Sequence, residues 1–394
     1  MGHPFHSKVV IMFKFFKRKK REMDLSEFSF GIRTAAGQLV TEQSAMAIPA
    51  VFACVRVLAE SCGSLPLIVY ERKPDGTKRR AREFGLYKLL HDAPNPYMDA
   101  VSFFELMVGH CALRGNAYAK VERNRHGEVI ALWPLLPQNM VVKVDDGQLI
   151  YSYTHNGVVQ RYEWQDIFHL KGLTHDGVIG VSPLSLLRET IGRAQAQNDY
   201  SARFFSNDAS PGGVLEHPQH LSNEALARLR RTWEAKFKQN NAHTIAILED
   251  GMSFKSVGIS PEDSQMIDSQ KFSVVEIARA FRVPLNLIQD HERSTYSNVT
   301  EQNRSFVVHT LTSWLTRVEQ ACNRVLLTEQ EKERYFCEFL LDSLLRGDQK
   351  TRYECYEIGL NAGFLSRNDV RKYENLSPIP GGDDYARSGG QQIN

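Results

Sequence analysis

The sequence of 394 residues contains no run of about 18 consecutive apolar residues, the length that a helix needs to cross a bilayer. Its six cysteines lie far apart and include no Cys-x-x-Cys pair. In a chain of this length, such cysteines are typical of reduced thiols in a cytosolic protein and not of a disulfide framework. We therefore expect neither a membrane-spanning helix nor disulfide bonds.

A large excess of charge of either sign is also absent. The chain has 48 Lys and Arg against 46 Asp and Glu, a formal net charge of +2. A protein that clamps nucleic acid tightly needs a cation for each phosphate that it neutralises, and it is usually strongly basic. The composition argues against such a clamp, but not against a protein that surrounds DNA. The basic run at residues 17–21 is interpreted as part of a solvated, disordered arm, with a contact to DNA as the alternative.

The signatures of nucleotide hydrolysis and of nucleophilic catalysis are incomplete. Residues 172–177 have the glycine spacing of a phosphate-binding loop, but Val178 stands where that loop requires lysine. Residues 180–184 begin like a nucleophile elbow, but Pro183 has no backbone N–H to supply to an oxyanion hole. Ser182 is therefore better interpreted as a helix cap.

A metal site is not indicated either. His217 and His220 are the closest pair of histidines in the second half of the chain, and no cysteine or patterned carboxylate completes a ligand set. We therefore expect no metal, no cofactor and no catalytic residues.

The first half of the sequence combines helix and strand patterns. Helices are predicted at residues 45–64, 84–91 and 99–113, and a strand at 65–70. The pairs His126-Gly127, Asp146-Gly147 and Asn156-Gly157 separate β-rich runs, and the last two pairs supply the positive φ that type I′ turns require. This half is therefore predicted to be an α+β domain with three hairpins.

The second half is predicted to be mainly helical. Ser182 and Pro183 begin a helix, and a small α/β insertion with a helix at 222–238 and strands near 213–216, 244–248 and 254–257 follows it. A second helix leads out of the insertion from residue 260 and ends before Pro284. A long helix at 298–327 carries one apolar face, formed by Val307, Leu311, Trp314, Val318, Cys322 and Val325.

The loop between these last two helices is unusual. It contains no glycine and consists almost entirely of short polar and charged side chains, from Asp290 to Asn298. Such side chains contribute little to packing, so we interpret the loop as a surface that faces a passing polymer.

Several segments, in order from about residue 40 to 385, resemble the portal proteins of tailed bacteriophages of the HK97 family. They are residues 49–60, 65–67, 180–184, 204–205 leading to 211–215, 272–284, 294–298, and 361–363 through 380–384. Residues 1–11 match nothing in that family, while 12–17 are similar to its usual opening. Met1 and Met12 therefore both remain candidate starts.

The resemblance implies the portal fold, an α+β architecture of wing, stem helices, α/β clip, long wing helix and helical crown. Residues 1–40 would be an arm, 41–180 the wing, 181–208 a stem helix, 209–259 the clip, 260–283 the second stem helix, 284–297 the tunnel loop, 298–328 the long wing helix, 329–378 the helical crown and 379–394 a flexible tail.

The resemblance also implies a function. The chain would form a dodecameric ring at one capsid vertex, through which terminase packages double-stranded DNA and through which the DNA is later ejected. The implied partners are other copies of the chain, double-stranded DNA, the terminase large subunit, the major capsid or scaffold protein and the head–tail adaptor, with no membrane. The implied location is the virion, and the host cytoplasm during assembly.

Two sets of site residues follow from the resemblance. Those expected to line the DNA channel are His291, Glu292, Arg293, Ser294, Thr295 and Tyr296, of which His291, Arg293 and Tyr296 are expected to face the lumen. Those expected to contact terminase and adaptor are Arg228, Arg230, Arg231, Lys236 and Lys238. For the second set, an ordinary solvated face is the alternative, because charge runs usually form one.

Two other functions stay open. The first is a DNA-processing packaging enzyme, which would need the phosphate loop or metal ligands that the sequence does not display. The second is an oligomeric virion protein without a channel.

Overall fold

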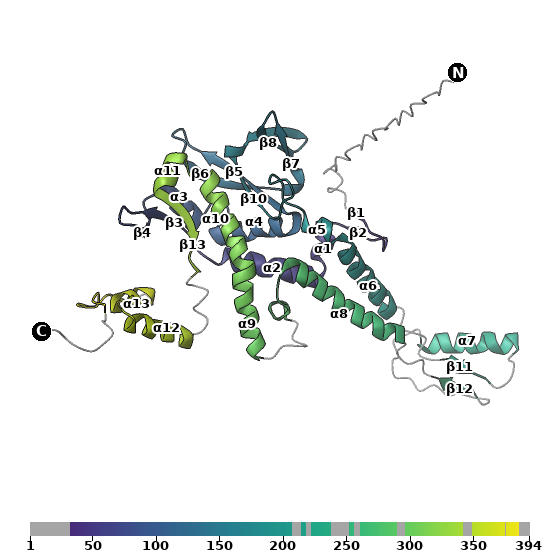
Figure 1. Ribbon diagram of the computed structural model, residues 1–394. Helices are drawn as coiled ribbons and strands as arrows, with labels where there is room; N and C mark the ends of the chain where they lie inside the picture. Colours follow the sequence, from purple (N-terminus) through teal and green to yellow (C-terminus); the bar gives the residue numbers. More distant parts are fainter. Residues whose placement is uncertain are drawn as a thin grey trace, which may run out of the picture.

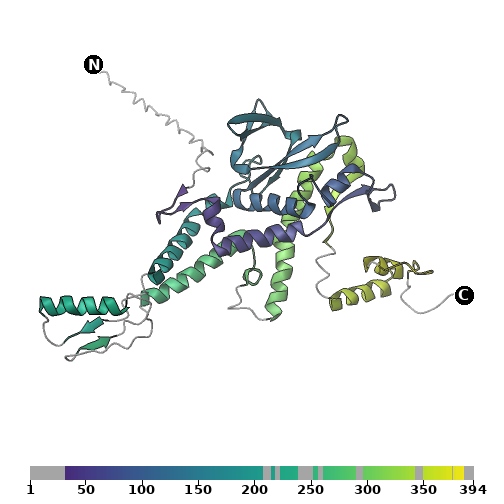
Figure 2. The ribbon, with the colours of Figure 1, turned by 180° about the vertical axis from the view of Figure 1, so that it is seen from behind.

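The computed structural model describes residues 32–206, 214–217, 222–237, 252–255, 261–289, 296–341, 349–374 and 376–385. Within these residues, helices combine with small sheets whose strands all pair antiparallel, so the predicted α+β class is confirmed. Figures 1 and 2 show a central body, an arm formed by helices α6 and α8, and a separate helical segment near the C-terminus.

Helices α2 (Pro49–Gly63) and α4 (Ala100–Arg114) pack together at the centre of the body. The predicted apolar face of α2 is buried, and Pro49 begins the helix, where a missing N–H costs little. The side chain of Asp99 caps α4 by accepting a hydrogen bond from Ser102 N (2.7 Å). Among the large side chains, Phe103 and Met107 of α4 are fully buried.

The body also contains three three-stranded sheets. The first has the strand order β10 (Ile167–Lys171), β5 (Asn116–Arg123) and β6 (Val129–Leu135). The second has the order β13 (Tyr335–Phe339), β3 (Leu67–Arg72) and β4 (Lys78–Arg80). The third has the order β7 (Met140–Asp145), β8 (Gln148–His155) and β9 (Val158–Glu163). The three predicted hairpins are confirmed, with positive φ at Gly127, Gly147 and Gly157. Short elements complete this part of the chain: α1 (Glu42–Met46), α3 (Gly85–His91), η2 (Pro137–Asn139) and η3 (Trp164–Asp166).

Strand β13 corrects the prediction that residues 329–378 form a helical crown. Helix α11 (Glu329–Arg334) is followed directly by this strand, which pairs with β3. The strand has the alternation of a half-buried sheet, with Cys337 and Phe339 buried. Its aromatic residues suit a pleated surface that packs on a core.

The arm consists of α5 (Pro183–Leu186) and α6 (Arg188–Ser206), which lead outward, and α8 (Pro261–Phe281), which returns. Figure 1 shows β11 (Val214–Glu216), α7 (Asn223–Phe237) and β12 (Ser253–Lys255) at its outer end. The order of helix, small α/β unit and returning helix is as predicted. The strand predicted at 244–248 lies outside the described residues.

The predicted long helix contains an interruption. It consists of α9 (Tyr296–Phe306), the π-helix η5 (Val307–Leu311) and α10 (Thr312–Val325). Because a π-turn holds an extra residue, the side chains that follow it are rotated around the helix axis and the apolar face changes. Leu311, Val318, Cys322 and Val325 are buried as predicted, whereas Val307 and Trp314 are half-buried. Phe306 and Leu315, which were not predicted, are buried.

Both ends of the described chain are more ordered than predicted. Within the predicted arm of residues 1–40, β1 (Ile32–Arg33) and β2 (Leu39–Val40) form a hairpin, and Ala35 N donates a hydrogen bond to Glu189 Oε2 (3.0 Å) on α6. Residues 1–31 lie outside the described part. Within the predicted flexible tail, Gly382 O accepts a hydrogen bond from Asn368 N (2.8 Å). The hairpin corrects the prediction of a disordered arm for residues 32–40, and the bond to Asn368 ties Gly382, within the predicted tail, to α13.

The last helices are α12 (Gln349–Asn361) and α13 (Arg367–Tyr373). Ser366 caps α13, and Asp369 completes the capping box that the sequence predicted. Gly363 between the helices has a positive φ, as expected for a glycine after a helix C-terminus.

Candidate functional site

The predicted channel loop is described only at its two ends. His291, Glu292, Arg293, Ser294 and Thr295 lie outside the described residues, and Tyr296 begins α9 without a described side chain. What the structure shows is therefore how the chain enters and leaves this loop.

The entry to the loop is a tight turn after α8. Arg282 adopts a positive φ of 56°, and the following Val283 N donates to Ala278 O (3.0 Å), which ends the helix. Pro284 then prevents the helix from continuing. The buried side chains of Phe281 and Val283 fix this turn in the core. The short helix η4 (Leu285–Ile288) leads from the turn to the loop.

The exit from the loop is tied to its entry by two hydrogen bonds. Asn286 Nδ2 in η4 donates to Asn303 Oδ1 in α9 (2.8 Å). The Thr310 hydroxyl, in the π-helix, donates to Arg282 O (2.8 Å). Each bond joins a buried side chain, Asn286 or Thr310, to a partner residue that is exposed. The two ends of the loop are thus held to one frame.

The π-helix has a local cause and a local consequence. Val307 O accepts the backbone N–H of Thr312, five residues later, and also a hydrogen bond from the Thr312 hydroxyl (2.8 Å), which adds a second contact across the widened turn. The same turn brings the Thr310 hydroxyl to the end of α8. The extra residue therefore lets the long helix bury Leu311 and hold Arg282 at once.

The two arm helices are joined by a contact that changes character along its length. Near the body, buried Ile191 of α6 and Ile277 of α8 belong to the main hydrophobic core. Farther out, polar groups take over: Gln197 Nε2 donates to Ser269 Oγ (2.7 Å), and Ser273 Oγ donates to Gln197 Oε1 (3.2 Å). Such hydrogen bonds contribute about 1 kcal/mol each, less than a packed apolar side chain.

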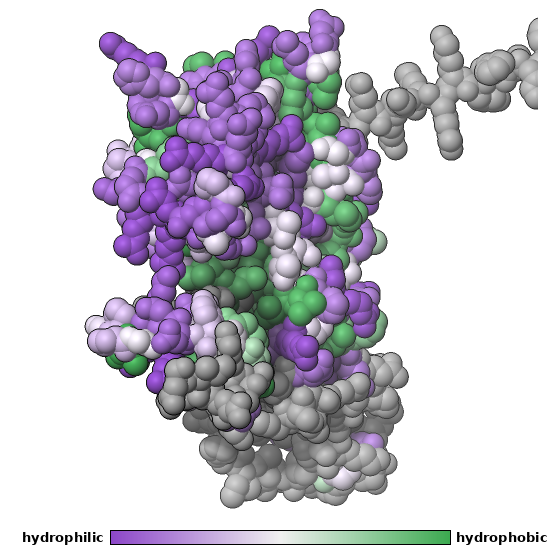
Figure 3. Space-filling view, turned by 60° about the vertical axis from the view of Figure 1, so that its left-hand side comes forward, coloured by the Kyte–Doolittle hydropathy of each residue, from purple (hydrophilic) through white to green (hydrophobic). Residues whose placement is uncertain are grey.

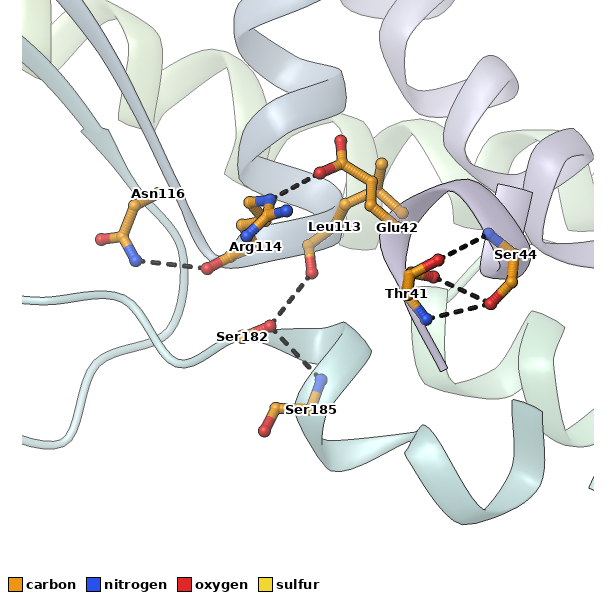
Figure 4. A network of polar contacts seen from close by, with 8 residues as sticks. All are labelled: Thr41, Glu42, Ser44, Leu113, Arg114, Asn116, Ser182 and Ser185. Carbon is orange, nitrogen blue, oxygen red and sulfur yellow. Dashed lines mark hydrogen bonds and ion pairs between the residues drawn. The ribbon is translucent and has the colours of Figure 1, made fainter. Parts of the chain in front are cut away.

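The junction between the body and the arm is built from polar contacts (Figure 4). Ser182 Oγ accepts from Ser185 N (3.3 Å), which confirms its prediction as a helix cap, and donates to Leu113 O (3.3 Å) at the end of α4. Arg114, the last residue of α4, binds Glu42 of α1 (2.6 Å). The start of the arm is therefore tied to the last turn of a core helix.

Asn116 forms the buried centre of this junction. Its Nδ2 donates to Gly180 O (2.8 Å) and Arg114 O (3.2 Å), while its Oδ1 accepts from Gly180 N (2.7 Å). His169 Nε2 lies 3.0 Å from the same Oδ1, and Tyr151 Oη lies 3.0 Å from His169 Nδ1. Since Oδ1 can only accept, Nε2 carries the proton and Nδ1 accepts from the tyrosine hydroxyl.

The neutral state of His169 makes the stability of the body dependent on pH. Burial, reinforced by Lys171 and Arg324, lowers the pKa of His169 to about 3. Between that value and the ordinary pKa of about 6.5, the unfolded chain binds more protons than the folded one. The free energy of unfolding is therefore expected to fall by up to about 1.4 kcal/mol per pH unit as pH drops below about 6.5.

Denaturant unfolding at pH 6.5 and pH 5.5 measures how the free energy of unfolding changes with pH. The slope of this free energy against pH is expected to be shallower for His169→Gln than for the unmodified chain. His126→Gln, in an exposed hairpin, is the matched control and keeps the original slope. Equal slopes in all three proteins would contradict the assignment of the effect to His169.

The predicted clip residues lie on or near α7. Arg228 and Arg231 are exposed and line a shallow pocket with Ser222, Glu224 and Ala225 at the start of the helix. Arg230 and Lys236 belong to α7 without described side chains, and Lys238 lies outside the described residues. The structure thus places two of the five predicted cations on one surface.

The motifs that suggested catalysis form ordinary structural contacts. In the glycine-rich loop after β10, Asp176 accepts from Val178 N (2.8 Å) and Ile179 N (2.9 Å), which folds the loop on itself. Across the described residues, no group of three or more His, Cys, Asp or Glu side chains could hold a metal ion. Nor, in this same part of the chain, is any helix long and apolar enough to cross a membrane.

The chain matches known proteins along most of its length. A family model described as phage portal protein matches residues 49–375. The chain is 35% identical over 376 residues to a probable portal protein of Streptomyces phage phiC31, covering 91% of this chain and 81% of that one. It is 34% identical over 351 residues to the portal protein of Enterobacteria phage HK97, covering 87% and 82%.

Solved structures agree with these relatives. A chain from the virion of a native gene transfer agent particle superimposes with a TM-score of 0.64 at 26% identity, covering 90% of this chain and 98% of that one. A crystal structure of an HK97 family phage portal protein from Corynebacterium diphtheriae, at 17% identity, shares the fold with a TM-score of 0.52, covering 78% and 97%. The chain therefore belongs to the phage portal protein family, and its α+β architecture is the fold of that family.

Proposed function

We propose that twelve copies of this chain form a ring at a single capsid vertex, through which terminase packages double-stranded DNA and through which the DNA later leaves. The observation that carries the proposal is the frame around the channel loop. The chain on either side of this loop of polar residues is held by hydrogen bonds from the buried side chains of Asn286 and Thr310, so the loop begins and ends at fixed positions. Membership of the portal family supports this reading.

The parts of the proposed ring follow from the observed elements. We assign the wing to residues 41–180 with α9, α10 and β13, the stem to α6 and α8, the clip to the unit around α7, the tunnel loop to 284–297 and the crown to the helices after residue 349. Strand β13 joins the wing in this assignment because it pairs with β3.

A ring that conducts DNA must not bind it tightly, because many Lys or Arg contacts with phosphates would hold the duplex strongly. The described side chains that flank the loop support weak contact. Arg282, Glu301, Asn303 and Arg304 are exposed and mix positive, negative and neutral groups. In this function the chain makes and breaks no covalent bonds, and the terminase supplies the energy for packaging.

The other partners in the proposal are the terminase large subunit, the capsid or scaffold protein and the head–tail adaptor. Exposed Arg228 and Arg231 in the clip would attract acidic surfaces of terminase and adaptor, and such charges mainly raise the rate of association. Figure 3 shows hydrophobic surface gathered in a band across the middle of the molecule, which supports burial against other copies. The proposed location is the virion, with assembly in the host cytoplasm.

Arg293→Ala and Tyr296→Ala in the channel loop are expected to reduce packaged DNA severalfold while rings still form, because symmetry repeats each change around the channel. Nuclease-protected DNA per particle measures the effect, and negative-stain imaging of the purified rings accompanies it. Arg161→Ala, in the exposed strand β9, is the matched control and is expected to package normally.

The same experiment separates the other candidate functions. Normal packaging by both loop variants would remove the loop from the mechanism. Particles without a central hole would favour a virion protein that has no channel. Nucleotide hydrolysis or DNA cleavage by the purified chain would favour a packaging enzyme.

A further inference from the structure

The C-terminal module, defined here as residues 349–374 and 376–385, lacks a hydrophobic core of its own. Within its described side chains, no apolar residue is buried, in contrast to the body, where buried apolar residues extend from Val40 to Phe339. The module instead exposes large hydrophobic side chains: Tyr353, Ile358, Phe364, Tyr373, Leu376, Ile379 and Tyr385. Segments of about 40 residues or fewer usually need a partner or another constraint to stay folded.

The module nevertheless has a defined shape, which local polar contacts maintain. Arg352 Nε binds Glu374 Oε1 (2.8 Å) between its two helices, and Tyr356 Oη donates to the same oxygen (3.1 Å). The side chain of Asn368 holds the following segment through Ile379, donating to its carbonyl (3.0 Å) and accepting from its N–H (2.8 Å). These contacts orient the helices but bury little apolar surface, so they do not replace a core.

Helix α12 presents two different sides. One lines a shallow, mostly apolar groove with α13, formed by Tyr353, Tyr356, Glu357, Leu360, Asn361 and Val370. Cys355 and Ile358 are three residues apart and share a side of the helix. At 100° per residue, that side faces away from the groove, and Glu354 lies on it, four residues before Ile358. A groove and an apolar ridge thus occupy opposite sides of one helix.

We propose that a second copy of this chain covers the module, with the Cys355–Ile358 ridge of one copy seated in the α12–α13 groove of the next. A ridge and a groove on opposite sides make a head-to-tail contact, and such contacts close into rings when the rotation allows. Charge favours the same pairing. Glu354 accompanies the ridge, whereas exposed Arg367 lies on α13 three residues before Val370, which lines the groove.

The inference rests on the proposed ring, and it explains how the C-terminal modules of that ring become stable. Each module would be completed only by its neighbour, so the module would fold as the ring forms. A chain from the neck of a native gene transfer agent particle, solved with C12 symmetry, is 27% identical to this one and superimposes with a TM-score of 0.62, covering 86% of this chain and 92% of that one. That arrangement supplies the neighbouring copies that the contact requires.

Cys355 provides a natural probe, because the other five cysteines are buried. The full chain is labelled with a water-soluble fluorescent maleimide, as the isolated subunit and as the purified ring, and the labelling rate is followed with time. We expect labelling to be at least roughly tenfold slower in the ring, since the thiol reacts only when the contact opens. Cys355→Ser should abolish the signal in both samples.

A matched pair of variants tests the ridge itself. Ile358→Asp should return Cys355 in the ring to the labelling rate of the subunit, or prevent ring formation altogether. Val158→Asp should leave Cys355 protected, since Val158 lies in the β8–β9 hairpin and is as exposed as Ile358, at 60% against 62%.

The possible failures are distinguishable. A wild-type ring in which Cys355 reacts as fast as in the subunit overturns the inference and leaves the proposed function intact. Slow labelling already in the subunit also overturns it, because another part of the same chain would then cover the ridge. If Ile358→Asp rings keep Cys355 protected, a different protein or surface is the occupant. Absence of any ring with the unmodified chain overturns the proposed function and the inference together.

Discussion

Gly115→Ala is expected to lower the free energy of unfolding of the body by about 4 kcal/mol, among the larger effects of single substitutions. Gly115 ends α4 with φ at +75°, and an added Cβ would lie 2.1 Å from Val181 O. The left-handed conformation alone costs a side chain about 1–2 kcal/mol. The steric clash with Val181 O adds to this cost, because a backbone atom cannot rotate away as the end of a flexible side chain can.

The neighbouring backbone cannot easily move to make room. Gly115 O accepts a hydrogen bond from Gly172 N (2.8 Å), and Gly180, beside Val181, is held by Asn116. Three backbone segments therefore meet at one point where no Cβ fits. Shifting the segment at Val181 would displace Ser182 and with it the start of the arm.

Gly177→Ala is the matched control for this prediction. Gly177 has nearly the same φ of +76°, but an added Cβ there would meet nothing within 4 Å. Only the conformational cost of about 1–2 kcal/mol is expected. Denaturant unfolding of the two full-length variants isolates the steric contribution. Equal losses in both would show that the segments do not meet as closely as described.

Much of the fold could be predicted from the sequence because its signals are local. A glycine in a hairpin turn, as at Gly147 or Gly157, sets the sign of φ by itself. Ser182 and Ser366 cap helices through atoms only three residues away. The periodic apolar face of α2 reports burial without knowledge of its partner.

The differences arise where a distant partner decides the outcome. Residues 335–339 form a strand because β3 offers an edge more than 260 positions away in the chain. The hairpin at 32–40 lies against α6, whose Glu189 accepts the Ala35 N–H. The π-turn in the long helix adds one residue that an apolar periodicity cannot locate. None of these partners can be identified from composition or periodicity.

In the candidate site, too, some features could be predicted from the sequence and others could not. The polar loop stands out in the sequence, and its residues 290–295 remain a prediction. The residues that anchor it, Asn286, Asn303 and Thr310, were not predicted, because a buried asparagine or threonine looks like an exposed one in a sequence. One signal was available: Thr310 lies next to Leu311 on a predicted apolar face.

Asn116→Ala is expected to lower the free energy of unfolding by about 3–5 kcal/mol, since buried polar groups that lose their partners cost about 1–3 kcal/mol each. The change leaves Gly180 N, Gly180 O and the His169 Nε2 proton without the Asn116 side chain. In the native junction the single amide of Asn116 forms hydrogen bonds with all three groups, so no ordered water is required there. The arm would consequently lose its fixed connection to the body.

Asn124→Ala separates this effect from the loss of any turn asparagine. The Asn124 side chain accepts from His126 N (2.9 Å) and Glu128 N (3.0 Å), but the bonds lie in a solvent-exposed hairpin where water can replace it. A loss of about 1 kcal/mol is expected there. Unfolding of both full-length variants gives the comparison, with ring formation at raised temperature as a second measurement. If Asn116→Ala were no more damaging than Asn124→Ala, then packing at Gly115 and Gly180, and not the buried amide, would hold the arm to the body.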